Sequence, residues 1–258
     1  MKNILFLTLT LTLLSSSARA GLMDQLGLGK TDGTVQGASA ALPASLSSDQ
    51  VVAGLKEALG KGVNHAIASL GHEGGFLTNL NVKIPMPDKL RTVEKTLRTL
   101  QQNQLADDFV TSMNRAAEQA VPEAASVFGD AIKQMSIADA KNVLTGTNNA
   151  ATEYFRRTTQ TNLFAKLHPI VEKTTGAVNA TALYKKMMDK VNAGNSLGGF
   201  LGSGGLVKTG DWDVDNYVTT KALDGLFKMV ADEEKSIRAN PAARTTDLLK
   251  SVFGAVTK

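Results

Sequence analysis

The sequence predicts an all-α protein, a single-domain multi-helix bundle preceded by a mobile N-terminal segment. From residue 47 onward, apolar residues recur at a spacing of about 3.6, the period of an amphipathic helix. The helical stretches run for about 10–20 residues between short connections, and no strand-like alternation of apolar and polar residues appears. No repeat of fixed period is present. A helical bundle accounts for all of these observations.

Residues 1–20 have the organisation of a signal peptide. Lys2 supplies the positive start, residues 4–14 are mainly apolar, and Ala18-Arg19-Ala20 forms a small-x-small cleavage site. An uncleaved membrane anchor is the weaker interpretation, because a spanning helix needs about 20 apolar residues. We therefore expect a mature chain that begins at Gly21 and is periplasmic or secreted.

The composition excludes several classes of function. The 258-residue chain has no cysteine, which excludes disulfides, thiol catalysis and cysteine-ligated zinc. The formal net charge is +4, and removing residues 1–20 with their two basic residues leaves 26 − 24 = +2. Basic residues alternate with acidic ones along the predicted helices, so nucleic acid is not an expected partner.

The helical domain is expected to span residues 47–258. Residues 21–46 are rich in Gly, Ser, Ala and Thr and lack periodicity, which is typical of a mobile segment. Ser47 then begins the first helix, and Gln50 stands three residues later, where it completes a capping box.

Residues 71–87 are predicted to form a loop before the next helix. Residues 82–85 are extended, because a proline disfavours helix at the residue before it, and a short isolated β-pair is possible here. Asp88 is expected to cap the helix that follows. The apolar positions of that helix are Leu90, Val93, Leu97 and Leu100.

Residues 105–135 form two helices joined at Pro122, and we expect the other helices to pack around this pair. Pro122 suits the first turn of a helix, where its missing N–H breaks no hydrogen bond. Small alanines allow neighbouring helices to approach closely. The apolar stripe of the first helix consists of Leu105, Phe109, Met113, Ala116 and Ala120.

Helices are also predicted for the rest of the chain. Ser136 begins one that ends at Gly146, residues 149–164 form another, and Pro169 starts a fresh turn or kinks the helix before it. The remaining elements are a helix over residues 179–191, a glycine-rich loop over 194–210, a long helix from Asp213 to Asn240-Pro241, and a last helix around residues 248–253.

Four strings are similar to those of one protein family. They are GLKEAL at residues 54–59, IPMP at 84–87, MNRAAEQAVP at 113–122 and NPAARTTDLLKSVF at 240–253, and ALDGLF at 222–227 supports them. On these strings the chain resembles domain-of-unknown-function family 4197, which consists of uncharacterised exported bacterial proteins. The resemblance covers nearly the whole mature chain apart from the glycine-rich loop. It implies an exported single-domain protein and carries over no established activity.

The aspartates at 211, 213 and 215 begin like a calcium-binding loop. Asn216 stands where such a loop has glycine, and Ala222 stands where it has a bidentate acid. An N-cap followed by an acid in the first helical turn is the simpler interpretation.

The glycine-rich loop of residues 194–210 does not match a phosphate-binding loop, because no glycine precedes Lys208 and no strand precedes the loop. It is a flexible connector, a lid over a pocket, or a membrane contact through Phe200 and Leu201. The histidines at 65, 72 and 168 lack the spacing of metal ligands. We therefore expect no metal and no cofactor.

The best candidate site combines two predicted helices. Arg115 and Glu118 are three residues apart and can pair on one helix face. Arg244 lies in a first helical turn, where the helix dipole disfavours a cation, so it needs an acidic partner. The set is either an interhelical salt-bridge network or an anion-binding pocket. Its members are Asn114, Arg115, Glu118, Arg244 and Asp247.

These observations favour a non-catalytic envelope protein that binds a ligand or partner in a helical cleft. One alternative is a hydrolase or lyase that acts on an envelope polymer through paired carboxylates. Another is a membrane-surface protein that uses the loop of residues 194–210. No catalytic residue is predicted, because any helical protein carries scattered acids. The oligomeric state stays open.

Overall fold

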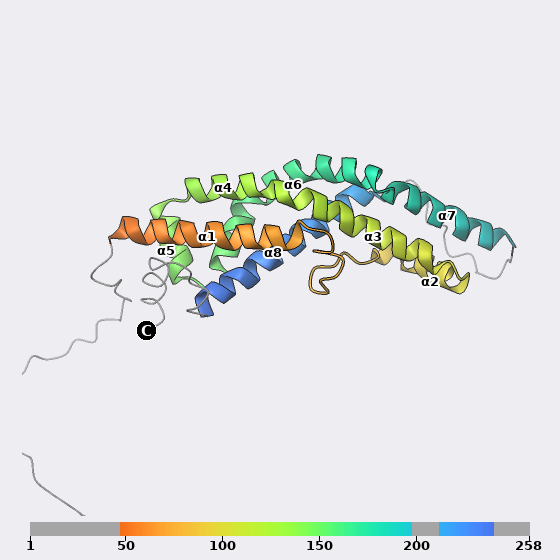
Figure 1. The fold of residues 1–258 in the computed structure, drawn as a ribbon, viewed down its shortest axis with the longest axis horizontal. Coiled ribbons are helices and arrows are strands. Elements are labelled where there is room, and N and C mark those ends of the chain that lie inside the picture. The colour runs from red at the N-terminus through yellow and green to blue at the C-terminus, as the bar shows by residue number, and fades with distance from the viewer. Residues whose placement is uncertain (1–46, 198–211, 240–258) are drawn as a thin grey trace, which may run out of the picture. The chain divides into compact units, whose positions relative to one another are not determined.

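The computed structural model describes residues 47–197 and 212–239, with the backbone alone for residues 194–197. All of these residues lie in one compact unit, residues 40–258. The described ranges contain helices and turns and no strand, which confirms the all-α prediction (Figure 1). None of the helices in these ranges combines the length and hydropathy that a membrane crossing requires.

The helices follow one another with short connections, except after α1 and between α7 and α8. In chain order the elements are α1 (Ser48–Leu70), η1 (Asp88–Leu90), α2 (Arg91–Thr99), α3 (Asn103–Ala120), η2 (Val121–Glu123), α4 (Ala124–Gln134), α5 (Ile137–Thr145), α6 (Ala150–Ala177), α7 (Ala180–Leu197) and α8 (Val214–Ala239).

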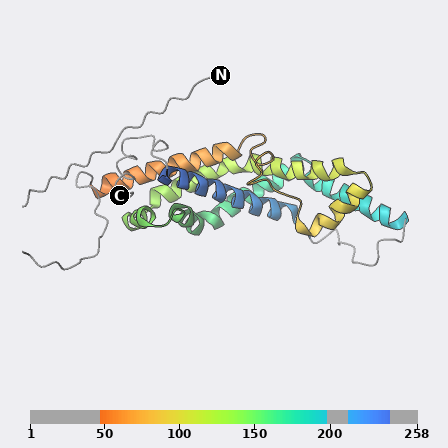
Figure 2. The same ribbon diagram turned by 90° about the horizontal axis from the view of Figure 1, so that it is seen from below.

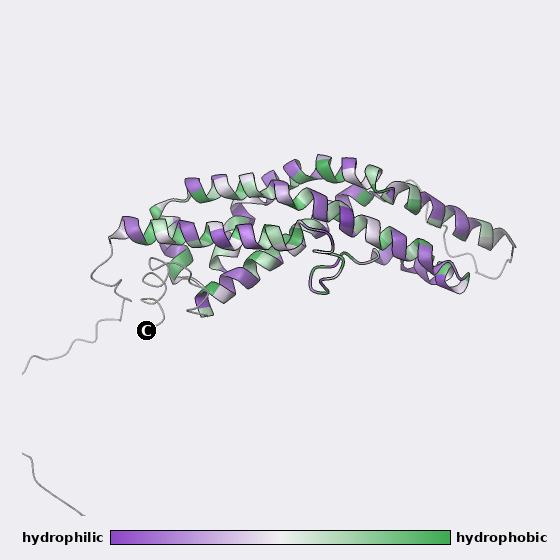
Figure 3. Ribbon diagram, in the orientation of Figure 1, coloured by the Kyte–Doolittle hydropathy of each residue, from purple (hydrophilic) through white to green (hydrophobic). Residues whose placement is uncertain are grey.

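The α6 helix packs against α3, α4, α5, α7 and α8, so the helix pair of residues 105–135 is not the sole centre that its sequence predicts. The α3 helix belongs to that pair. It contacts α2, α6, α7 and α8, while α8 also lies along α1 and α6 (Figures 1 and 2). Phe109, Met113 and Ala116 of α3 are fully buried. Apolar bands alternate with polar bands along the helices (Figure 3), so each helix turns one face to the shared core.

Local capping explains where several helices begin. The Ser47 hydroxyl accepts from the Gln50 N–H at 3.2 Å, and the Gln50 side chain accepts from the Ser47 N–H at 2.9 Å, which confirms the capping box. Ser136 begins α5 with the same arrangement. Asp213 accepts from the Asn216 N–H at 2.9 Å, as expected of an N-cap.

Two predictions about the second helix are wrong. Asp88 is not its cap: it lies inside η1 and forms an ion pair with Arg91, while Pro87 precedes the turn. Leu100 is 42% exposed, because α2 ends at Thr99 and the chain reverses through Gln101, whose φ is 60°.

The fresh turn predicted at Pro169 does not form. The α6 helix runs through it as one continuous element. A proline inside a helix removes one backbone hydrogen bond, but Leu163, Leu167 and Val171 on either side of it are fully buried. Core packing therefore keeps the helix together across the proline.

Two boundaries of α7 also differ from the prediction. Asn179 is not helical, because its φ of 59° places it in the left-handed turn between α6 and α7. At the other end α7 continues to Leu197, so the first residues of the predicted glycine-rich loop are helical. The rest of that loop, with Phe200 and Leu201, and the predicted helix around residues 248–253 lie outside the described residues.

Candidate functional site

The connection between α1 and η1, residues 71–87, is called the 71–87 segment here. It contains no strand: Val82, predicted to be extended, lies in a turn, and residues 83–87 have no regular secondary structure. Although it lacks regular structure, four of its apolar side chains are buried. They are Phe76, Val82, Ile84 and Met86.

Asn114 of α3 binds the backbone of this segment. Its side-chain carbonyl accepts from the Ile84 N–H at 2.8 Å, and its amide group donates to the Ile84 carbonyl at 2.9 Å. The same amide also donates to the Val110 carbonyl at 2.7 Å. Asn114 is fully buried, so it supplies the partners that the buried Ile84 backbone needs.

Glu118, one turn further along α3, binds the beginning of the segment. Its Oε1 accepts from the N–H groups of Phe76 and Leu77 at 3.0 and 3.1 Å. Its other oxygen, Oε2, is buried and has no hydrogen-bond partner among the described residues. Asn114 and Glu118 therefore fix two points of the 71–87 segment from one face of α3.

The α8 helix fixes the segment from another direction. Gly225 permits a close approach, because a Cβ at this position would lie 2.8 Å from Phe76 and 3.2 Å from Val82. The Tyr217 hydroxyl donates to the Pro85 carbonyl at 3.1 Å, and partial burial raises the pKa of Tyr217. The strings IPMP, MNRAAEQAVP and ALDGLF thus meet at this segment.

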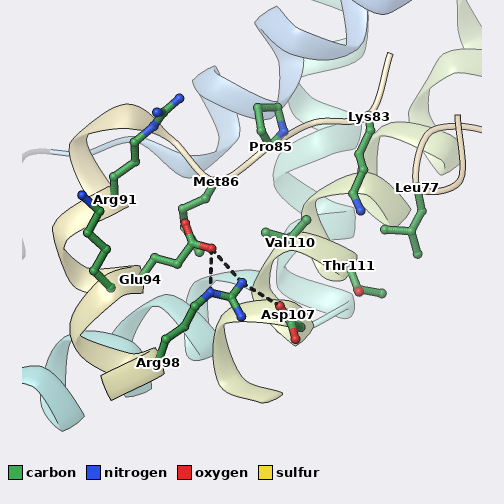
Figure 4. Close-up of a pocket in the computed structure, with 11 residues that line it drawn as sticks. Leu77, Lys83, Pro85, Met86, Arg91, Glu94, Arg98, Asp107, Val110 and Thr111 are labelled. Carbon is green, nitrogen blue, oxygen red and sulfur yellow. Dashed lines mark hydrogen bonds and ion pairs between the residues drawn. The ribbon is translucent and has the colours of Figure 1, made fainter. Parts of the chain in front are cut away.

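A cleft of about 600 Å³ opens between the 71–87 segment, α2 and α3 (Figure 4). We call it the basic cleft. Side chains from all three elements converge on it, and Lys83 points from the segment toward Val110 and Thr111. Its charged lining residues are Lys83, Arg91, Glu94, Lys95, Arg98 and Asp107.

Arg98 joins the two acids of the basic cleft. Its guanidinium donates to Glu94 at 2.7 and 3.1 Å and to Asp107 at 3.1 Å. The hydrogen bond to Glu94, and then that to Asp107, raises the pKa of Arg98. Both acids of the cleft are therefore already bound to a cation from within the protein.

Cations outnumber acids in the basic cleft. Four basic side chains and two acidic ones give a formal charge of 4 − 2 = +2. Arg91 pairs with Asp88 outside the lining set, at 2.7 Å. Lys83 and Lys95 are exposed and have no ion-pair partner within the described part of the chain. Two ammonium groups are therefore available to an anionic ligand.

Arg115 does not pair with Glu118 as the sequence suggested. Its guanidinium instead binds Glu73 at the start of the 71–87 segment. Arg115 and Lys186 line a separate hollow of about 590 Å³, which shares Thr111 with the basic cleft. The α3 helix thus carries the buried Asn114 and Glu118 on one face and Arg115 on another.

Two of the five candidate residues, Arg244 and Asp247, lie outside the described residues. The basic residues of the cleft were not predicted from the sequence, because they are spread over the segment and α2 without a motif. Within residues 47–197 and 212–239, no three side chains of the metal-ligating types His, Cys, Asp or Glu gather into a metal site.

A family model described as "Protein of unknown function (DUF4197)" matches residues 45–254. No curated protein and no solved structure matches the chain. The match covers most of the sequence and includes all five of the strings noted above, so it confirms the resemblance. The chain belongs to the family of proteins of unknown function DUF4197.

Proposed function

We propose that this protein is exported and binds an anionic ligand in the basic cleft without transforming it. One observation carries the proposal: Lys83 and Lys95 face a preformed cleft and have no ion-pair partner among the described residues. Carboxylate and phosphate groups are the natural partners of such ammonium groups.

The wall that carries Lys83 supports this proposal, because it is held in place without a ligand. Asn114 binds Ile84, the residue after Lys83, and Tyr217 binds Pro85, the next residue along the chain. A group that is already ordered loses less conformational entropy when a ligand arrives. Lys83 is therefore presented on a rigid backbone.

The size of the cleft suits a small molecule. Its volume of about 600 Å³ falls within the range of about 300–1,000 Å³ that is typical of small-molecule sites. Leu77, Met86 and Val110 add apolar surface beside the lysines. A compact organic anion with two or more negative groups fits this combination.

Catalysis is the less favoured function. A hydrolase with paired carboxylates needs one acid to donate a proton and another to act as base or nucleophile. In the basic cleft, Arg98 donates hydrogen bonds to both Glu94 and Asp107. Because both carboxylates are bound to the same guanidinium, neither is free to act as a proton donor or a nucleophile. We therefore favour binding over turnover.

Calorimetric titration of the mature protein tests the proposal, with citrate and inorganic phosphate as separate probes at low salt. We expect saturable binding that weakens as salt is added. Lys83→Ala and Lys95→Ala should each weaken it about tenfold, because a charge-assisted hydrogen bond contributes about 1.5–3 kcal/mol.

Lys141→Ala is the matched control, because Lys141 is an exposed lysine on α5, away from the cleft. It should bind citrate like the parent protein. Equal losses in all three variants would indicate nonspecific charge attraction and contradict the proposal, as would the absence of saturable binding to either probe.

The intact mass of the exported chain should correspond to a start at Gly21.

A further inference from the structure

A second cavity, of about 740 Å³, lies where the end of α6, the first half of α7 and the start of α8 meet. We call it the aromatic cavity. Its lining includes Tyr184 and Trp212 together with Lys185, Asp189, Asp213 and Asp215. It shares no lining residue with the basic cleft, and the proposed function does not use it.

Aromatic rings form one wall of this cavity. The Trp212 ring lies 5.5 Å from that of Tyr184, at an interplanar angle of 47°. Phe109 of α3 lies 6.2 Å from both rings, and Tyr217 is 5.5 Å from Trp212 on the α8 side. These contacts hold the indole and phenol rings in fixed, tilted positions.

Tyr184 lines this cavity with its ring and carries a buried polar group. The residue is only 6% exposed, and its hydroxyl has no hydrogen-bond partner among the described residues. A buried hydroxyl without a partner costs about 1–3 kcal/mol. Burial raises the pKa of Tyr184, so the group remains a neutral hydroxyl at physiological pH.

The charge of the aromatic cavity is opposite to that of the basic cleft. Three acids and one lysine give 1 − 3 = −2. Asp213 caps α8 with one oxygen, and Asp215 accepts from Thr175, which leaves each with a second oxygen. The N-terminus of α8 contributes only about half a positive charge, so the cavity remains negative.

Asp189 is the acid most available to a ligand. It lines the cavity from α7, and no ion pair involves it within the described part of the chain. Lys185 lies one turn before it on the same helix without forming a salt bridge to it. The carboxylates do not gather closely enough for a metal site among the described residues.

We propose that the aromatic cavity binds an organic cation, a quaternary or alkylated ammonium group on a short polar chain. Such a cation is attracted by the faces of aromatic rings, Trp above all. Asp189 supplies a carboxylate for it, and the Tyr184 ring supplies aromatic surface beside Trp212. A large, weakly hydrated cation suits carboxylates that are spread around a cavity rather than clustered.

The intrinsic fluorescence of Trp212 tests this directly, because it is the only tryptophan in the chain. Choline is the probe, and 3,3-dimethyl-1-butanol, its uncharged isostere, is the matched ligand control. We expect a saturable change with choline and none with the isostere or with sodium chloride at the same ionic strength.

Asp189→Asn should weaken choline binding at least fivefold while the helical circular dichroism stays unchanged. Asp224→Asn, an exposed acid elsewhere on α8, should bind choline like the parent. Lys83→Ala should also leave it unchanged, which separates this site from the basic cleft. An equal response to choline and its isostere, or the absence of any saturable response, would overturn the proposal.

Discussion

Asn114 and Arg115 are neighbours on α3, yet their side chains have opposite surroundings. Asn114 is fully buried and makes three hydrogen bonds to backbone groups. The Arg115 side chain is 37% exposed, and that of its partner Glu73 is 76% exposed. The sequence places both in one candidate set, but only Asn114 has the burial that makes a lost partner costly.

We predict that Asn114→Ala lowers the free energy of unfolding by about 2–4 kcal/mol, because each buried backbone group of Ile84 that loses its partner costs about 1–3 kcal/mol. Arg115→Ala should lower it much less than Asn114→Ala does, as expected of an exposed ion pair. Urea denaturation of both variants measures this. Similar losses in the two would contradict the exposed position of Arg115.

The Arg115–Glu73 pair has its own signature in the titration of Glu73. The hydrogen bond from the Arg115 guanidinium, and then its charge, lower the pKa of Glu73 below its ordinary value of 4.5. Since the folded pKa is lowered, any stability from the pair is present above pH 4.5 and is lost as the pH falls through the lowered pKa. Carboxyl resonances should report a higher Glu73 pKa in Arg115→Ala.

At the scale of elements, Glu234 of α8 joins three helices. Its two oxygens accept from the N–H groups of Ala151 and Thr152 at 2.9 Å each, at the start of α6. Arg238 binds Glu234 at 2.9 Å and donates to the Val143 carbonyl near the end of α5 at 2.6 Å. One buried ion pair thus satisfies orphan groups at a helix start and a helix end.

We predict that Glu234→Ala lowers the free energy of unfolding by about 3–5 kcal/mol, because it removes the buried carboxylate that Arg238 and the first turn of α6 share. The two side chains of this pair are only 6% and 12% exposed. Thermal unfolding provides the measurement, with the exposed Asp232→Ala on the same helix as control. If both variants melt at the same temperature, Glu234 does not cap α6.

At the scale of the whole described unit, one hydrophobic core joins the helices from α1 to α8. The 71–87 segment is part of this core through Phe76 and Ile84, so the basic cleft is built on the same packing. Trp212 contacts Phe109 of α3 and is thereby coupled to the centre of the packing.

We expect the unit to unfold in one cooperative transition. Urea curves followed by Trp212 fluorescence and by far-ultraviolet circular dichroism should coincide, because both probes then report loss of the same core. A fluorescence transition at clearly lower urea would contradict this and would mean that the α7–α8 end opens separately. As a control, the change in Trp212 fluorescence on adding choline should persist at urea concentrations below the midpoint that the two curves share.

The sequence by itself determined the features that depend on neighbouring residues. Helical periodicity predicted the helices, and Ser47, Ser136 and Asp213 predicted where three of them begin, because a cap bonds to a residue only three positions away. Pro122 predicted the break after α3, where η2 begins. The family was also identifiable, since its strings are continuous in the sequence.

Only the tertiary structure decided which polar groups are buried and which are available. Asn114 meets Ile84 across 30 positions of sequence and Glu234 meets Ala151 across 83, so no local pattern predicts either contact. Packing likewise carried α6 through Pro169. Lys83 and Lys95 line the same cleft only because buried hydrogen bonds hold the 71–87 segment beside α2 and α3. Local backbone preferences contribute a few tenths to about 1 kcal/mol per residue, and burial over long sequence separations outweighs them.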